Sequence, residues 1–443
     1  MGDVRDLRIA IIGAGMGGLG TALAFAKKGF KHIDVYETAS NLGFVGAGIQ
    51  MPPNVVRVLD RLGCWDEIYV EATNVQGTSI RRGSTDTELS HVQMPDIAAK
   101  YGYPHCTGHR WSLANGLFNG CQKEAAIRFH FSTALVKINS WAAPVSLTLQ
   151  PRHGEPFTIE ADLVLAADGV KSVTRTQMLA ELGTASEEED TGQAAYRIML
   201  TREQMAHDPE MLALLDSDTV VRWVGERRHI IAYAVSNHQI YNLSTAQPDT
   251  NFAAATNATY TTRGSKSAML QVYGDFCPLV HRMLDLVPDG EVCEWKLRVH
   301  KPLPTWVLGS VALLGDACHP TLPHLSQGAA MAIEDGAVLA EVVSRVPDLS
   351  SPESLTKTLK VYEALRKPHC TALVDLAAHS GRILHLGEGA AKEARDREFR
   401  ENGRSGSVPD KWASPDVQKM IYGLDCMREA AEKFGELYQS VDV

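Results

Sequence analysis

The start of the chain alternates between apolar runs and polar breaks in a strand–helix–strand pattern. An apolar run at Ile9–Ile12 leads into a glycine-rich segment, and the uncharged stretch that follows continues to a polar stop at Lys28 and Gly29. A second apolar run then ends at Glu37. Short apolar runs predict buried strands, and the longer stretch between them predicts a helix. We therefore expect a βαβ unit here.

Three glycines in this unit, Gly13, Gly15 and Gly18, have the spacing of a dinucleotide-binding turn. In such a turn the first glycine permits the sharp bend, the second lets a pyrophosphate approach the backbone, and the third lets helix and strand pack closely. The free N–H groups of the helix N-terminus attract the phosphates. Glu37 is placed to accept hydrogen bonds from ribose hydroxyls. These features alone leave open whether the nucleotide is NAD(P) or FAD.

The rest of the pattern predicts a second domain and a helical end. Alternating runs near 78–82 and 88–93, and several more between 193 and 244, indicate an antiparallel sheet. The strand that begins at Asp162 runs into Asp168, and the one that begins at Val311 runs into Gly315 and Asp316. Helical patterns cover residues 267–287, 329–344, 352–383 and 416–438.

Composition narrows the class of protein. The 443 residues are 44% hydrophobic and 22% charged, which is typical of a soluble globular chain. A net charge of −10 argues against nucleic-acid binding. The eight cysteines are scattered without a C-x-x-C pair, so we expect reduced thiols, no metal site and a cytoplasmic protein. Glycines within Ile9–Ala26, and the charges before it, argue against a signal peptide or a membrane span.

Three motifs stand in the order and at the separations of a known family. They are the first glycine turn with Glu37, the element from Asp168 through Ser172 to Arg175, and the Gly315-Asp316 motif with His319, Pro323 and Gly328. From Arg8 to about Ala377 the chain resembles the single-component FAD-dependent aromatic hydroxylases of the para-hydroxybenzoate hydroxylase type. Segments 101–110 and 313–339 look most like fungal salicylate hydroxylase-like enzymes.

The resemblance implies an α/β fold, with a Rossmann-like FAD-binding domain of the GR2 type, an inserted antiparallel-sheet substrate domain and a helical C-terminus. We expect a small aromatic substrate as the partner, and a monomer or homodimer without nucleic acid or membrane. The expected FAD-binding domain comprises 1–75, 100–182 and 293–345, the substrate domain 76–99 and 183–292, and the C-terminal helices 346–443.

The resemblance also implies tightly bound FAD, with NADH or NADPH as a transient co-substrate and O2 as oxidant. A second Gly-Asp turn is unnecessary in an NAD(P) dehydrogenase but fits an extended FAD, whose ribityl chain Asp316 can bind. A helix N-terminus near Gly328 faces the flavin pyrimidine, a dipole effect of about 1 kcal/mol. Besides the first turn, the expected FAD contacts are Glu37, Ala47, Gly48, Arg110, Asp168, Gly315, Asp316, Gly328 and Ala329.

Substrate contacts are expected from the sheet that faces the flavin. Arg197 and Tyr233 lie mid-strand in apolar runs, and similar enzymes carry Arg and Tyr near substrate and flavin at these strand positions. The alternatives are a structural arginine that reaches the rim and an ordinary core tyrosine. Arg222 and His229 are candidates for holding a carboxylate or relaying a proton, although exposed strand charge explains them equally well.

The implied reaction is hydroxylation of a phenolic acid through a flavin C4a-hydroperoxide. For salicylate, our first choice of substrate, carbon dioxide leaves and catechol forms. Pro323 can offer its carbonyl to a substrate hydroxyl, as the matching proline does in the family, and His324 is a candidate proton relay. The chain departs from the family pattern at Ser326, where glycine is usual, and at Ala330, where asparagine is usual.

Other functions remain open from the sequence alone. A tailoring hydroxylase or epoxidase of a polyketide or indole product would keep the family and change the substrate, because pocket shape sets that choice. A non-oxygenating flavoprotein reductase would be yellow, but its NAD(P)H turnover would be the same with and without a phenol. An NAD-dependent dehydrogenase would be colourless.

Overall fold

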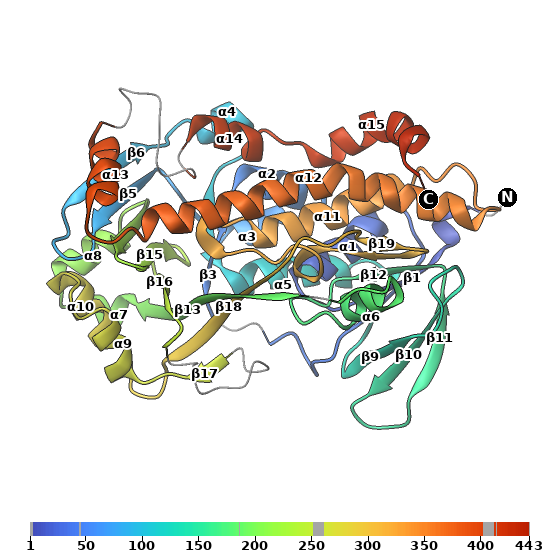
Figure 1. Cartoon of the computed structure of the whole chain (residues 1–443), viewed down its shortest axis with the longest axis horizontal. Helices are drawn as coiled ribbons and strands as arrows, with labels where there is room; N and C mark the ends of the chain where they lie inside the picture. Colours follow the sequence, from blue (N-terminus) through green and yellow to red (C-terminus); the bar gives the residue numbers. More distant parts are fainter. Residues whose placement is uncertain are drawn as a thin grey trace.

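Two sheets and one long helix organise the chain (Figure 1). The computed structural model describes residues 3–43, 46–185, 187–250, 261–401, 412 and 414–442. A six-stranded sheet and an eight-stranded sheet belong to different parts of the molecule, and α12 (Pro352–Leu384) extends along both. The fold is α/β, with a Rossmann-like unit, a sheet-rich unit and a helical C-terminal part, which confirms the predicted fold class.

The six-stranded sheet contains the first βαβ unit. Its central strand β1 is buried from Ile9 to Ile12 and pairs in parallel with β2 and β12, as expected for a sheet that is covered on both faces. Its edge strand β19 runs antiparallel to β20. In spatial order the strands are β19 (Val307–Leu308), β20 (Val311–Leu313), β12 (Leu163–Ala166), β1 (Arg8–Ile12), β2 (His32–Tyr36) and β8 (Ile127–His130).

The eight-stranded sheet contains the predicted alternating strands. It is antiparallel except between β14 and β5, which run parallel. These two strands come from distant segments, so no hairpin dictates their direction, and local pattern gave no sign of it. In spatial order the strands are β17 (Thr261–Arg263), β18 (Cys293–His300), β13 (Glu188–Thr201), β16 (Ile240–Pro248), β15 (Arg228–Val235), β14 (Thr219–Gly225), β5 (Gly77–Arg82) and β6 (Glu88–Gln93).

Two small antiparallel sheets and the helices complete the described fold. The small sheets are β11 (Phe157–Ala161), β10 (Val145–Pro151) and β9 (Thr133–Ile138), and β3 (Gly48–Met51), β7 (Cys106–His109) and β4 (Thr73–Asn74). Besides α12, the α-helices are α1 (Met16–Lys27), α2 (Pro53–Arg61), α3 (Trp65–Tyr69), α4 (Ile97–Tyr101), α5 (Arg110–Gln122), α6 (Val173–Glu181), α7 (Arg202–Met205), α8 (Pro209–Leu215), α9 (Lys266–Val272), α10 (Pro278–Asp285), α11 (Gly328–Val343), α13 (Ala390–Arg400), α14 (Pro415–Tyr422) and α15 (Cys426–Ser440). Within the described residues, no helix is both long and apolar enough to cross a bilayer.

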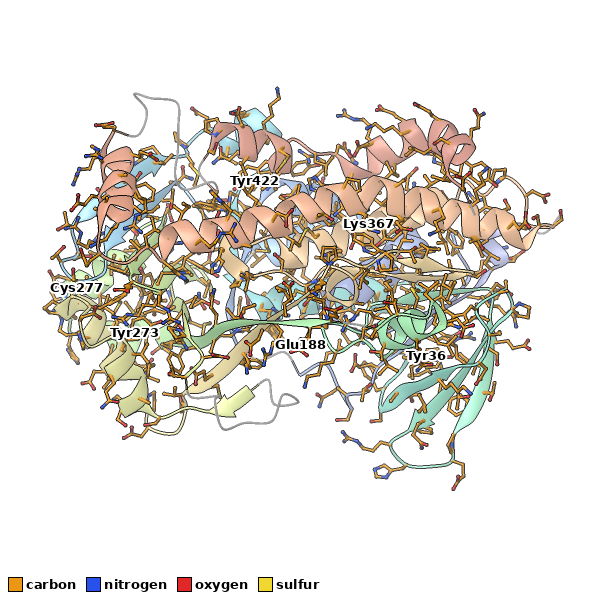
Figure 2. The ribbon with its side chains drawn as sticks, in the orientation of Figure 1. Tyr36, Glu188, Tyr273, Cys277, Lys367 and Tyr422 are labelled. Atoms are coloured by element: carbon orange, nitrogen blue, oxygen red, sulfur yellow. The ribbon has the colours of Figure 1, made fainter. Side chains whose placement is uncertain are left out.

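One expected domain boundary falls on the wrong side of a strand. The sequence analysis assigned residues from 293 onward to the FAD-binding domain, but β18 pairs with β13 and β17 of the eight-stranded sheet. Glu188 marks the start of β13, the long strand with which β18 pairs (Figure 2). Since all backbone partners of β18 belong to this sheet, the boundary lies after His300 rather than before Cys293.

Two expected helices are each divided in the structure. The segment 267–287 forms α9 and α10, because Pro278 lacks a backbone donor and begins a new helix. Tyr273 and Cys277 lie in this break, at the end of the molecule that holds the larger sheet (Figure 2). The segment 416–438 forms α14 and α15, which are separated after Gly423.

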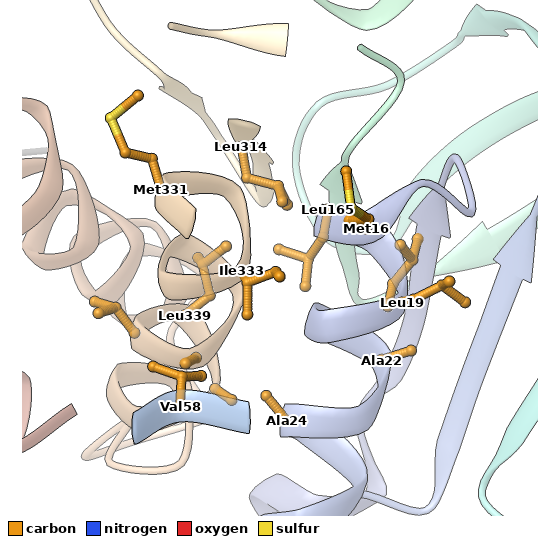
Figure 3. Packing of buried hydrophobic residues seen from close by; sticks show 14 of the residues in the cluster. Met16, Leu19, Ala22, Ala24, Val58, Leu165, Leu314, Met331, Ile333 and Leu339 are labelled. Carbon is orange, nitrogen blue, oxygen red and sulfur yellow. The ribbon is translucent and has the colours of Figure 1, made fainter. Parts of the chain in front are cut away.

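Helices α1 and α11 pack closely beside the six-stranded sheet (Figure 3). Small residues permit this approach: a Cβ added at Gly17 would lie 3.1 Å from the Ala332 Cβ, and one at Gly336 would lie 2.7 Å from the Thr21 Cα. Ile333 on α11 fills the remaining space against α1. This contact therefore fixes the relative position of α1 and α11, the two helices that begin at the two glycine-containing turns.

We expect Gly336→Ala to lower the free energy of unfolding by about 1–3 kcal/mol, because the added methyl group overpacks the α1–α11 contact. Gly435→Ala in α15 is the matched control, since a Cβ there meets nothing within 4 Å and alanine favours a helix by up to about 1 kcal/mol. Thermal and urea unfolding of both variants measure the difference. Equal stability of the two variants would contradict close packing at Gly336.

Candidate active site

One cleft of about 670 Å³ lies where the glycine turns of the smaller sheet meet the inner face of the larger sheet. Most of the predicted site residues line it, although they come from nine separate segments of the chain. Those in the cleft are Gly15, Ala47, Gly48, Arg110, Arg197, Arg222, His229, Tyr233, Gly315, Asp316, Pro323, His324, Gly328 and Ala329. Gly13, Gly18, Glu37 and Asp168 are outside its lining.

The first glycine turn has two structural glycines and one that is open to the cleft. Gly13 has a φ of +99°, and a Cβ there would lie 2.5 Å from the Ala167 carbonyl oxygen. A Cβ at Gly18 would overlap the Gly13 carbonyl oxygen. Gly15 instead has open space around it and begins α1 without a side-chain cap. The turn thus leaves backbone N–H groups available to a ligand.

Two predicted acidic ligands are held by the backbone beside the cleft. Glu37 accepts hydrogen bonds from the backbone N–H groups of Ala14 (2.8 Å) and Ala39 (2.7 Å), which fixes its carboxylate next to the glycine turn. Asp168 accepts from the Ser172 hydroxyl (2.6 Å) and from the Thr174 N–H (3.0 Å). The carboxylate of Asp168 therefore helps to begin α6, and its expected contact with the cofactor has no support from its position.

The late Gly-Asp loop presents an acid to the cleft. Gly315 has a φ of +59°, a conformation that favours glycine, and the next residue, Asp316, has its side chain exposed to the cleft. Asp316 nevertheless lies deep in the molecule, so loss of bulk water raises the pKa of its carboxyl group, while the charges of His319, Arg110 and Arg175 oppose this. Arg110 begins α5 and also lines the cleft.

A buried group of charged residues anchors this loop to α11 and α12. Asp335 on α11 accepts from the Gly315 N–H (3.0 Å) and pairs with His319 (2.6 Å) and with Arg366 on α12 (2.8 Å). Burial alone would raise the pKa of Asp335, but the charges of His319 and Arg366 outweigh it and hold that pKa well below its usual range. Cys318 lies near enough to share a metal ion with His319 and Asp335, yet the Arg366 guanidinium opposes a cation there.

The same charges reach the start of α11. Arg366 also donates to Glu334 (2.7 Å), and Glu334 accepts from the Asn54 amide (2.8 Å). That amide donates in turn to the side-chain oxygen of Gln327 (3.1 Å), the residue that precedes α11. The position of the α11 N-terminus is thus tied to α2 and α12 through buried hydrogen bonds.

Arg197 and Tyr233 face the cleft from the larger sheet. The Arg197 guanidinium lies 4.7 Å from the centre of the Trp295 ring, and burial together with the charge of Arg110 lowers the pKa of Arg197 to about 10. Tyr233 is buried, which raises the pKa of its hydroxyl. A Cβ at Gly48 would lie 2.7 Å from the Tyr233 ring, so a glycine is required where β3 passes this tyrosine.

Asn242 is a residue of the site that the sequence analysis missed. It is opposite Tyr233 in the β15–β16 register, and its side-chain oxygen accepts from the Gly48 N–H at 2.7 Å. Its Nδ2 has no hydrogen-bond partner among the described residues, although Asn242 is 1% exposed and lines the cleft. A polar residue in the apolar run of β16 was the only available signal. The unpartnered amide marks a place for a ligand acceptor.

Arg222, His229 and His324 form what we call the deep end of the cleft. His324 is 2% exposed, and neither ring nitrogen has a hydrogen-bond partner in the part of the chain that the structure describes. Burial, together with the charges of His385 and Arg222, lowers the pKa of His324 to about 3. Arg222 donates to the His324 carbonyl at 3.5 Å. The deep end therefore offers a cation and neutral imidazoles to a ligand.

Pro323 begins the turn that carries His324. Its ring is exposed to the cleft, and its carbonyl accepts the Ser326 N–H at 3.2 Å. Ser326 adopts a φ of +56°, the conformation for which the family's usual glycine is suited. The Ser326 N–H uses one lone pair of the Pro323 carbonyl oxygen, which has a second lone pair for a further donor.

The described residues fit an extended dinucleotide such as FAD. Helices α1 and α11 both begin in the cleft, both lack a side-chain cap, and neither has an acidic residue in its first turn. Two such helix ends attract phosphate and other negative charge to two separate points of one cleft. Glu37 lies beside the first point, and Asp316 lies near the second. This spacing suits a cofactor with a nucleotide at one end and a flavin at the other.

Comparisons with known proteins agree with this geometry. A family model described as an FAD binding domain matches residues 6–258, more than half of the chain. The FAD-dependent monooxygenase OpS4 of Beauveria bassiana (strain ARSEF 2860) is 31% identical over 436 residues, which cover 97% of this chain and 98% of the relative. A 3-hydroxybenzoate 6-hydroxylase of Polaromonas naphthalenivorans (strain CJ2) is 27% identical over 419 residues, which cover 94% and 96%.

Solved structures share the fold. A substrate complex of salicylate hydroxylase aligns with a TM-score of 0.76 and 22% identity over 99% of both chains. CtdE in complex with FAD and a substrate aligns with a TM-score of 0.78 and 19% identity, over 98% of this chain and 99% of that one. Together with the family match, the relatives and the two helix ends in one cleft, this leads to one conclusion: the chain belongs to the FAD-dependent aromatic monooxygenases.

Proposed function

We propose that this protein uses NAD(P)H and O2 to hydroxylate a phenolic acid, with salicylate as the first choice of substrate. The observation that carries the proposal is the charge of the cleft. Among its described lining residues, Asp316 carries the only carboxylate, against six arginines and lysines, of which Lys296 and Arg298 are paired with carboxylates outside the lining. The phosphates of FAD account for some of these cations near the glycine turns. Arg222 lies in the deep end beside His324, where its guanidinium provides positive charge for an anionic substrate.

The chain's own residues provide placement and proton handling. When bound, FAD supplies the redox chemistry, taking a hydride from NAD(P)H and delivering one oxygen atom of O2. Arg222 holds the carboxylate of the substrate, and Tyr233 orients its ring hydroxyl. The neutral imidazole of His229 accepts the hydroxyl proton, with His324 beside it, and loss of this proton makes the ring more electron-rich. The buried walls of the deep end keep water away from the reacting atoms.

A tailoring hydroxylase or epoxidase that acts on a larger product is the second candidate. It is supported by the relatives OpS4 and ntnJ of Nectria sp, which are 31% and 30% identical over 97% and 91% of this chain and are named only as FAD-dependent monooxygenases. The hydroxybenzoate hydroxylase is 27% identical, and two 6-hydroxynicotinate 3-monooxygenases are 32% and 33% identical over shorter stretches of 349 and 341 residues. Ligand binding separates the two candidates.

An anaerobic visible spectrum with a panel of ligands is the first test. Salicylate, 3-hydroxybenzoate and 6-hydroxynicotinate are titrated into the FAD-loaded enzyme, and the acid that perturbs the flavin bands is then tested for stimulation of NAD(P)H oxidation. We expect at least one acid to do both, and salicylate to release carbon dioxide. No perturbation by any acid would contradict the proposal. Binding without carbon dioxide release from salicylate would remove salicylate alone.

Arg222→Met tests the carboxylate contact. We expect the variant to bind the phenolic acid about tenfold or more weakly, a loss of about 1.4 kcal/mol or more, because one charge-assisted hydrogen bond is removed. Binding of the same phenol without its carboxylate is the matched control and should change little. Titration of the flavin spectrum measures both ligands. Equal loss of affinity for the two ligands would contradict the carboxylate contact and show that Arg222 only shapes the cleft.

A further inference from the structure

Three histidines meet at the deep end of the cleft, although they come from distant parts of the chain. His229 lies on β15, His324 lies in the turn after Pro323, and His385 directly follows α12. Their ring centres are 4.9 Å (His229–His385), 5.3 Å (His229–His324) and 5.7 Å (His324–His385) apart. The sequence analysis did not include His385, because nothing local connects the end of a long helix with this cleft.

Two of these histidines are joined by a hydrogen bond that leads away from the cleft. The Nδ1 of His229 lies 2.7 Å from the Nε2 of His385. His229 is buried and lines the cleft, whereas His385 is half-buried and is outside the lining. The Nε2 of His229 is the nitrogen that remains for a ligand. The pair therefore connects the deep end to the outer layer of the protein.

Both rings of the pair are neutral near neutral pH. Burial, together with the charges of His385, His324 and Arg222, holds the pKa of His229 well below its ordinary value. Burial and the charges of Arg222 and Arg395 lower the pKa of His385 to about 4. A neutral imidazole has one N–H donor and one acceptor nitrogen, whereas a charged one has two donors. A neutral ring can therefore accept a proton at one nitrogen while it donates the proton of the other.

We propose that His229 and His385 form the proton exit of the cleft, with His385 as the group that releases the proton to solvent. This inference rests on the proposed phenolic substrate. The substrate O–H bond breaks and its proton binds His229 Nε2; the Nδ1 proton of His229 passes to His385 Nε2; and the Nδ1 proton of His385 passes to water. The substrate is left as a phenolate and one hydronium ion is formed. The reverse transfers restore both tautomers when a proton returns to the product.

The neighbouring residues support this direction of transfer. The positive charge of Arg222 stabilises the phenolate that is left in the cleft, and it disfavours a proton that stays on His229. His324, whose ring nitrogens have no hydrogen-bond partner, packs against both members of the pair and offers a further contact to the hydroxyl. The proton therefore moves out through His385, the half-buried member of the pair.

Proton release upon ligand binding tests the exit without requiring catalysis. The oxidised FAD-loaded enzyme is mixed rapidly with the panel acid that perturbs its flavin spectrum, in weak buffer with phenol red. His385→Gln keeps a hydrogen bond to His229 but cannot relay a proton, so we expect release to slow by about tenfold or more. His385→Ala should behave likewise and recover part of the rate when imidazole is added. His153→Gln, an exposed histidine, is the matched control and should match the wild type.

The outcomes separate the exit from the proposed function. If both His385 variants bind the acid and release protons at the wild-type rate, the exit is overturned and the function stands. A wild-type enzyme that binds the acid without releasing a proton contradicts the exit as well. If the variants lose flavin or native unfolding cooperativity, His385 is structural and the exit is again overturned. If no acid perturbs the flavin of the wild type, the proposed function and the exit fail together.

Discussion

The pairing of Asp335 with His319 and Arg366 is the interaction on which the cleft depends. It joins α11 and α12 to the loop that carries Gly315, and it is buried throughout. A buried ion pair adds little net stability, because desolvation offsets the attraction, but removing one partner costs about 3–5 kcal/mol. These charges therefore provide conformational specificity. They permit one arrangement of the Gly-Asp loop and strongly disfavour others.

A fixed arrangement of the Gly-Asp loop matters because the cleft is assembled from units that have separate hydrophobic cores. One hydrophobic cluster surrounds the six-stranded sheet, and another lies under the larger sheet. Small residues at the α1–α11 contact set the distance between the two glycine-containing turns, and buried charges set the rotation of the second turn. Two helix N-termini then face one cleft. The larger sheet closes the other side with Arg197, Tyr233 and Asn242.

The parts of the fold that follow local rules could be predicted from the sequence. Gly18 is required by its contact with Gly13 within one βαβ unit, Gly13 adopts a positive φ in the turn, and α11 follows from an apolar stretch after a glycine. The late Gly-Asp motif was recognised through its distance along the sequence from the first glycine turn. The division at Pro278 was missed because the apolar period continues through it, and the parallel β5–β14 pair joins segments whose direction no local pattern reveals.

The parts of the site that depend on tertiary contact could not be predicted. Asp168 carries a family motif, yet its carboxylate is used by the first turn of α6. Asn242 was hidden in a strand, and its role follows from the Gly48 backbone that reaches it from another segment. His385 contacts His229 of the deep end only because α12 is long enough to extend from the smaller sheet to the larger one.

The dissociation constant of FAD from Asp335→Asn tests the central claim most directly. Asp6→Asn, which removes an exposed ion pair with Lys31, is the matched control. Flavin fluorescence titrations are made at a temperature where circular dichroism shows that both variants are folded. The account predicts that Asp335→Asn binds FAD at least about tenfold more weakly, because the loss of one contact between the loop and FAD corresponds to about 1.4 kcal/mol or more. It predicts unchanged FAD binding in Asp6→Asn. Equal affinity of a folded Asp335→Asn variant and the wild type would contradict the claim that these charges position the FAD-binding loop.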